Sequence, residues 1–312
     1  MFSKRIVREL NKRFKTHKQL YHILDIDSDK CRNDIESVTF HITYVPNKSF
    51  FNCSKLNRVI LNNVIHIGDF SFGICLELKE INIPPSVSVI GSHAFTFCSG
   101  LREVVIPGTV CKIGPSAFQN CSNLTTVTIE NGCKIIGENA FKNCYALESI
   151  TIPQSVEKIG DSAFQMCCAL QTLTILSDNL DLGANAFSYC SKLEFVHLQG
   201  VRILKTGVFS QCNKLTSLVI PTDVICIESS AFYNCTQLVY LDFEVYSLKK
   251  SFTNDSNLRE IINIIGARLN IDNMSVNYML TDFLTPEPIK VSSFCSTIEV
   301  FYDTEREIVF FD

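Results

Sequence analysis

A phenylalanine recurs along the chain, mostly in steps of 23 residues, and most of these phenylalanines are followed three residues later by a cysteine. A fixed period between about 20 and 50 residues is typical of solenoid proteins, whose repeats bury their apolar faces only by stacking on one another. The pattern predicts about ten stacked repeats of 22–23 residues. The phenylalanines of the series are Phe50, Phe72, Phe95, Phe118, Phe141, Phe164, Phe187, Phe209, Phe232 and Phe252.

One repeat, LESITIPQSVEKIGDSAFQMC over residues 147–167, shows the elements that each unit predicts. Ile150 and Ile152 alternate with polar residues, as in a short strand with one buried face. Pro153 has no N–H to donate, so it ends the strand. After a glycine that turns the chain, Phe164 follows on a predicted short helical turn, where its ring fills the interior.

The unit LxxIxIPxxVxxIGxxAFxxC resembles the 23-residue leucine-rich repeat of BspA-type proteins, which are found in bacterial surface proteins and in protozoan parasites. The resemblance covers about Val38 to Leu258. It implies an α/β leucine-rich repeat solenoid with parallel strands on a concave face and short helical or 3-10 turns on the other. Lys205 replaces the glycine of one repeat and Asp255 the cysteine of the last, which leaves the local turn geometry open at those places.

The ends of the chain depart from the repeat, which predicts a capping region over residues 1–37, a solenoid over 38–258 and a C-terminal cap or appendage over 259–312. Residues 1–24 read as a basic amphipathic helix, with an apolar stripe of Val7, Leu10, Phe14, Tyr21 and Leu24. We interpret this helix mainly as a solenoid cap. The alternatives are binding to an anionic membrane or to nucleic acid, or a mitochondrial-type presequence.

Composition and charge narrow the class of protein. A net charge of −4 gives no reason to expect nucleic acid as a partner, and no apolar run is long enough to span a membrane. Nine of the fifteen cysteines share one slot of successive repeats, which predicts a ladder of buried thiols rather than disulfides. Together with the absence of a secretory signal, this favours a cytoplasmic location, with the cell surface, reached by a non-classical route, as the alternative.

An acidic stretch gives the only metal-like pattern, and we do not assign it as a site. Asp25, Asp27, Asp29 and Glu36 fall at positions 1, 3, 5 and 12 of an EF-hand loop. However, Lys30 stands where that loop requires glycine. We therefore predict no metal and no cofactor, and interpret the stretch as the end of the first helix.

The solvent-facing slots of the predicted strands are the candidate binding surface, because they line the extended sheet of a solenoid. They divide into three zones: a charged end, a middle of threonine and serine, and an aromatic end. The charged end contains Arg58, Glu80 and Glu103, and the aromatic end contains Phe195, His197, Tyr240 and Asp242. Exposed aromatic residues on a rigid surface often dominate binding energy, although aromatic residues and threonine also simply favour strands.

These observations favour a non-enzymatic scaffold, expected to be a monomer, that binds a protein partner across its concave sheet, in adhesion or recognition. The alternative is a structural protein that associates with itself end to end. The threonine array also raises a minor third hypothesis, an ice-binding face. An enzyme is the class we exclude, because the histidines are dispersed and no catalytic motif occurs. We expect no small-molecule substrate.

Overall fold

The structure, a computed structural model, describes residues 35–243 except 41, 222, 225, 229 and 239, together with the strands at 300–302 and 309–311. The predicted helix over residues 1–24, the acidic residues Asp25, Asp27 and Asp29, and the last repeat with Phe252 and Asp255 lie outside the described residues. The proposed domain boundaries remain predictions.

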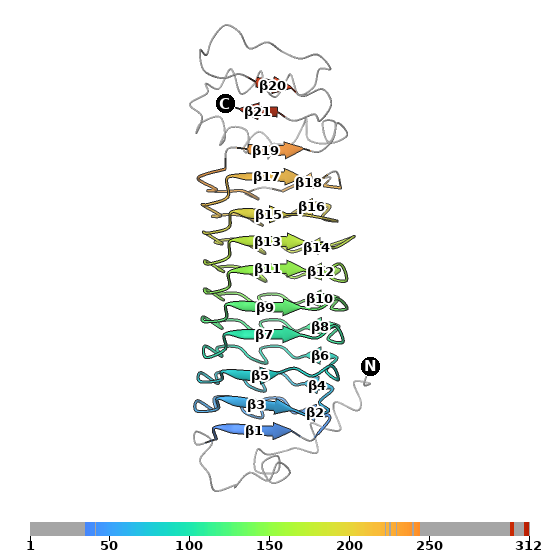
Figure 1. The fold of residues 1–312 in the computed structure, drawn as a ribbon, viewed down its shortest axis with the longest axis vertical. Helices are drawn as coiled ribbons and strands as arrows, with labels where there is room; N and C mark the ends of the chain where they lie inside the picture. Colours follow the sequence, from blue (N-terminus) through green and yellow to red (C-terminus); the bar gives the residue numbers. More distant parts are fainter. Residues whose placement is uncertain are drawn as a thin grey trace.

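Two ladders of parallel strands run the length of a single column of stacked coils (Figure 1). The longer strands are β1 (Ser37–Phe40), β3 (Arg58–Leu61), β5 (Glu80–Asn82), β7 (Glu103–Ile106), β9 (Thr126–Ile129), β11 (Ser149–Ile152), β13 (Thr172–Ile175), β15 (Phe195–His197), β17 (Ser217–Ile220) and β19 (Tyr240–Phe243). The shorter strands are β2 (Tyr44–Val45), β4 (His66–Ile67), β6 (Val89–Ile90), β8 (Lys112–Ile113), β10 (Ile135–Ile136), β12 (Lys158–Ile159), β14 (Asp181–Leu182), β16 (Ile203–Leu204) and β18 (Cys226–Ile227). A separate antiparallel pair joins β20 (Val300–Tyr302) to β21 (Val309–Phe311).

The column is nearly straight in the view of Figure 1, so we call the exposed side of the longer strands the long-strand face rather than a concave face. Its hydrogen-bonded pairing runs in three stretches, β1-β3-β5, β7 to β15, and β17-β19. Within each stretch the slots stay in register, as where Ser149 pairs with Thr172 and Ile150 with Leu173. The alternation of exposed and buried residues therefore repeats from coil to coil.

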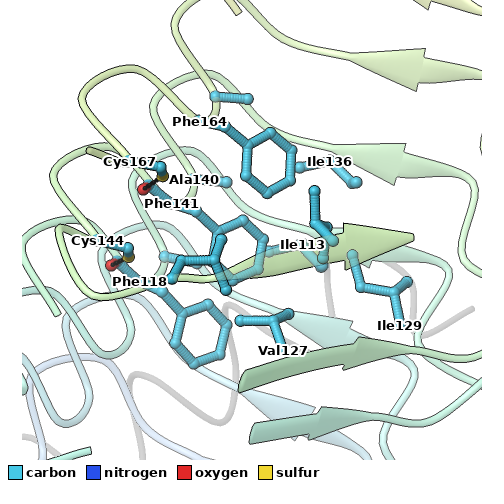
Figure 2. Close-up of a cluster of buried hydrophobic side chains, with 14 of the residues drawn as sticks. Ile113, Phe118, Val127, Ile129, Ile136, Ala140, Phe141, Cys144, Phe164 and Cys167 are labelled. Carbon is cyan, nitrogen blue, oxygen red and sulfur yellow. Dashed lines mark hydrogen bonds between the residues drawn. The ribbon is translucent and has the colours of Figure 1, made fainter. Parts of the chain in front are cut away.

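The interior is built around the column of phenylalanines that the sequence predicts. Consecutive rings from Phe50 to Phe232 stack with centroids 5.1–6.0 Å apart and planes within 1–16° of parallel. Figure 2 shows Phe118, Phe141 and Phe164 in this column, packed against Val127 and Ile129 of the long strand. The repeat period is thus a packing period, since each inner ring lies between the rings of the coils on either side.

The predicted cysteine ladder lies beside the rings, and its thiols are reduced. Each thiol from Cys75 to Cys235 donates a hydrogen bond to the phenylalanine carbonyl of the preceding coil, as from Cys144 Sγ to Phe118 O at 3.3 Å (Figure 2). Burial raises the pKa of the Cys121 thiol to about 12. These thiols therefore act as protonated donors within the core, and not as reactive groups.

The prediction of helical or 3-10 turns is wrong, because the described residues contain no helix. Each turn instead places two residues four apart in the left-handed region, for example Asn139 (φ 53°) and Asn143 (φ 62°). A right-handed helix cannot include such residues. The turn N–H groups also donate to the next coil, as Phe141 N does to Ala163 O at 2.7 Å, so they form a third ladder between coils.

The glycine that precedes six consecutive turns, from Gly68 to Gly183, is required by close backbone approach. A Cβ added to Gly137 would lie 2.6 Å from Pro115 N and 2.7 Å from Gly114 C. Successive glycines therefore mark a line along which the coils touch through their backbones.

The number of repeats also differs from the prediction. The described residues form about eight full turns of the solenoid and not ten, because the outermost repeats of the predicted count fall partly outside the described residues. In the described part of the chain, no helix is available that is long and apolar enough to cross a membrane.

Candidate interaction surface

Phe195 is the most prominent apolar side chain on the long-strand face. It is 66% exposed, more than any other large hydrophobic residue among those described. In the ladder it pairs with Thr172, and His197 pairs with Thr174, so the ring and the imidazole lie on the same exposed side of β15. A ring fixed on a hydrogen-bonded strand is held rigidly while it remains largely in contact with water.

The rest of the predicted aromatic end is brought near Phe195 only in part. Tyr240 pairs with Ser217 and Asp242 pairs with Val219, so the strand β17 separates Phe195 from Tyr240. The side chains of Tyr240 and Asp242 lie outside the described residues. Val219, which is exposed on β17, is the described apolar neighbour on this part of the face.

The middle of the face carries exposed hydroxyl groups in register, as the sequence predicts. Thr126 pairs with Ser149, which pairs with Thr172. Thr151 and Thr174 form a second row on β11 and β13. This zone offers hydrogen-bond donors and acceptors without charge, next to the Phe195 ring.

The charged end of the face is partly neutralised within the fold. Arg58 Nε lies 3.1 Å from Glu80 Oε2, between residues that pair directly across β3 and β5. Both side chains are exposed, so this ion pair adds little to stability. Glu103 lies on β7 beside the exposed Val105. The electrostatic field at this end of the face is therefore weaker than three unpaired charged side chains would give.

The described residues contain no group of three or more His, Cys, Asp or Glu side chains that could hold a metal ion. Of the EF-hand-like residues only Glu36 is described, where it is exposed just before β1. The interpretation of Asp25, Asp27 and Asp29 stays a prediction.

The structure has a second exposed surface that was not predicted from the sequence, because only the strand positions were considered as a binding surface. Several large hydrophobic residues are exposed in the turns that follow the core phenylalanines: Leu76, Phe97, Tyr145, Tyr189 and Tyr233. Phe97 and Tyr189 occupy a slot that holds asparagine in other repeats, as at Asn120 and Asn143. That exchange of a polar for an aromatic residue at a fixed slot was the available signal in the sequence.

Comparison with known proteins gives a family match along the repeats. The family description that matches is "BspA type Leucine rich repeat region", in six copies, over residues 29–146, 65–194, 111–239 and 181–266. No curated protein matches.

Several solved structures are similar to this chain. A leucine-rich repeat protein of Treponema pallidum is 31% identical, with 51% of this chain and 78% of that chain covered and a TM-score of 0.49. A leucine-rich repeat protein from Bacteroides ovatus is 23% identical, with 68% and 73% covered and a TM-score of 0.43. A leucine rich cell surface protein from Faecalibacterium prausnitzii is also 23% identical, with 70% and 82% covered and a TM-score of 0.36.

These findings correct the predicted compartment. The cytoplasmic prediction is wrong, because proteins of the BspA-type family, which the repeats match, are described as cell surface proteins. The prediction rested on the expectation of reduced thiols together with the absence of a secretory signal, but burial and hydrogen bonding keep the core thiols unreactive in any compartment.

Proteins of this repeat family are generally interaction or surface proteins built on a non-enzymatic scaffold. The matched copies together extend from residue 29 to residue 266, which is well over half of the chain. The chain belongs to the BspA-type leucine-rich repeat family.

Proposed function

We propose that this protein is a binding scaffold that engages a protein partner across the long-strand face, with Phe195 as its principal contact. The observation that carries the proposal is the 66% exposure of Phe195 on a rigid, hydrogen-bonded strand. Leaving a phenylalanine ring in water is unfavourable, and burying it against a partner recovers that free energy. The rigidity of the strand means that little conformational entropy is lost on binding.

The surroundings of Phe195 favour a protein over a small molecule. The ring is flanked by His197 on the same strand and by the hydroxyl groups of Thr172 and Thr174 on the next. An apolar contact surrounded by uncharged polar groups is the usual anatomy of a protein interface. Tyr240, Asp242 and the charged residues Arg58, Glu80 and Glu103 are proposed as outer contacts of the same face.

We also propose that this interaction takes place at the cell surface, in adhesion or recognition. Support comes from the family, whose homologues are described as surface proteins.

The experiment is a binding screen of the labelled protein against extracellular proteins, followed by affinity measurement for the best partner. We expect Phe195→Ala to weaken binding at least about tenfold and up to about a hundredfold, the range of a central aromatic contact. Tyr145→Ala is the matched control, because Tyr145 is also an exposed aromatic residue but lies on the turns.

A partner that loses affinity with Phe195→Ala and not with Tyr145→Ala supports the long-strand face. Equal affinity for the wild type, Phe195→Ala and the double variant Phe195→Ala/Tyr240→Ala would refute it. In that case the binding site lies elsewhere on the chain.

A further inference from the structure

A second strip of surface runs along the turns, and its residues repeat in three columns. We define the turn strip as the residues two, four and five positions after the core phenylalanine in the six coils from Phe72 to Phe187. The residues of the turn strip are Ile74, Leu76, Glu77, Phe97, Ser99, Gly100, Asn120, Ser122, Asn123, Asn143, Tyr145, Ala146, Met166, Cys168, Ala169, Tyr189, Ser191 and Lys192.

The columns of the turn strip are straight and evenly spaced. The core rings of these six coils are 5.1–5.4 Å apart throughout. Each turn is tied to the next by the same backbone hydrogen bonds, as from Ile74 N to Thr96 O at 2.7 Å and from Tyr189 N to Ser210 O at 2.7 Å. Equal spacing means that one half of the strip can be superposed on the other half without loss of register.

Apolar residues lie at the two ends of the turn strip, with amides at its centre. Phe97 and Tyr189 are each 47% exposed, and Leu76 is also exposed. Between them, Asn143 Nδ2 donates to Asn120 Oδ1 at 2.7 Å. The column two positions after the phenylalanine is therefore apolar, polar, apolar about a midpoint between the Phe118 and Phe141 coils, while the exposed Tyr145 lies beside this midpoint in the next column.

We propose that two copies of this chain associate side by side and antiparallel through the turn strip. The two-fold axis lies between the Phe118 and Phe141 coils, at right angles to the column. A two-fold interface is self-complementary, because each contact is made twice by the same pair of residues. Here the Phe72 coil faces the Phe187 coil, the Phe95 coil faces the Phe164 coil, and the Phe118 coil faces the Phe141 coil.

This arrangement places apolar residues against apolar residues. In the column two positions after the phenylalanine, Ile74 of one copy faces Tyr189 of the other, and Phe97 of one copy faces Met166 of the other. In the column four positions after it, Leu76 faces Ser191 and Cys168 faces Ser99. At the axis, the amides of Asn120 and Asn143 meet their symmetry mates, so polar groups are also matched.

The charges are complementary in the same arrangement. Glu77 and Lys192 are both exposed, five positions after Phe72 and Phe187, and neither forms an ion pair with the described residues. The antiparallel pairing places Glu77 of each copy against Lys192 of the other. In the same column Gly100 faces Ala169, which allows the two edges to approach closely.

No like charges oppose one another within the six coils. The other charged residues of these turns face uncharged ones at the same slot: Asp69 faces Ala184, Asp161 faces Ser92, Glu138 faces Pro115 and Lys142 faces Gln119. A strip of six coils is small for an interface, so we expect weak association, with a dissociation constant of about 1–100 μM.

Sedimentation velocity of the full chain over a range of concentrations around this value tests the proposal. We expect a monomer–dimer equilibrium for the wild type. Tyr189→Asn should weaken the dimer at least about tenfold, since it removes an aromatic contact. Asparagine is the residue that other repeats place at this left-handed position, so the variant is expected to fold.

A charge exchange tests the antiparallel register itself. Glu77→Lys and Lys192→Glu should each weaken the dimer about fivefold or more, because each creates a like-charge contact. The double variant Glu77→Lys/Lys192→Glu should return to within about threefold of the wild type. The two residues are five coils apart in one chain, so a mutual rescue can arise only between chains.

The matched control exchanges Lys112→Glu and Glu103→Lys, which lie on the strands β8 and β7, outside the turn strip. These variants should leave the dimer unchanged. A chain that stays monomeric at the highest concentration overturns the proposal. The proposal is also overturned if Tyr189→Asn leaves the dissociation constant of the dimer unchanged. It is overturned as well if the double charge exchange does not restore the affinity.

Discussion

Removing one ring from the middle of the phenylalanine column tests whether stacking between coils stabilises this protein. Phe141 is fully buried, and its ring lies 5.2 Å from both Phe118 and Phe164, with interplanar angles of 1° and 9°. Phe141→Ala therefore deletes a core side chain and two ring contacts at once. The variant leaves every strand of the two ladders unchanged in sequence.

The expected loss follows from general values for buried aromatic residues. Truncating a buried phenylalanine to alanine costs about 3–5 kcal/mol, including the cavity that remains. The two ring contacts, each about 0.5–1.5 kcal/mol beyond burial, place this site toward the upper end of that range. We therefore expect the free energy of unfolding to fall by about 4–5 kcal/mol, a large share of the about 5–15 kcal/mol of a typical domain.

Urea unfolding followed by circular dichroism measures this loss. Tyr145→Ala is the control, because Tyr145 lies in the same coil but is exposed, and its removal should change stability by no more than about 0.5 kcal/mol. The loss of stability in Phe141→Leu should fall between the losses in Phe141→Ala and Tyr145→Ala, since leucine keeps most of the volume but loses the ring contacts. A loss below about 1 kcal/mol for Phe141→Ala, or one equal to that of Tyr145→Ala, would refute the reasoning.

Three further predictions concern single groups. Burial lowers the pKa of His66 against a smaller opposing effect of Asp69, so the folded state binds fewer protons than the unfolded state. The urea midpoint of the wild type should therefore fall as the pH drops below about 6.5, and the midpoint of His66→Gln should fall by a smaller amount over the same range. Thiol alkylation of the folded protein, mapped by mass spectrometry, should modify the exposed Cys111 and spare the buried Cys144, whose pKa is well above its usual value; labelling of both at equal rates would contradict this. Ile74→Asn should raise the free energy of unfolding by about 0.5–1 kcal/mol, because a β-branched residue at φ 62° is strained, and an unchanged or lower urea midpoint would argue against that strain.

The stacking of the fold could be predicted because it is encoded in side chains that recur at fixed intervals. Among the described residues, the phenylalanine and the cysteine that recur in each repeat are buried as the sequence period predicts, as at Phe118 and Cys121. The turns were predicted incorrectly because helix and left-handed turn share the same apolar spacing. The distinguishing signal was local: Asn139, Asn143 and Asn185 occupy left-handed positions, which asparagine tolerates better than most residues.

The exposed surfaces were predicted less evenly. The exposure of Phe195 and His197 follows from strand alternation, so period-2 reasoning placed them correctly on the outer face. The exposure of Phe97 and Tyr189 depends on turn geometry that has no simple period, so it was missed. Whether Phe195 binds a partner is beyond any pattern in the chain, because an exposed strand position and a binding position look alike in one sequence.

The hydrogen bonds of the turns share one direction along the column. In every turn the N–H groups point toward the following coil and the accepting carbonyls toward the preceding one, as from Phe72 N to Ala94 O and from Phe95 N to Ala117 O. Bonds elsewhere in each coil point the opposite way, as from Gly91 N to Ile67 O and from Lys79 N to Asn57 O. The aligned peptide dipoles of the turns are therefore opposed by those of the flanking segments, and the column does not add them into a single dipole as a helix does.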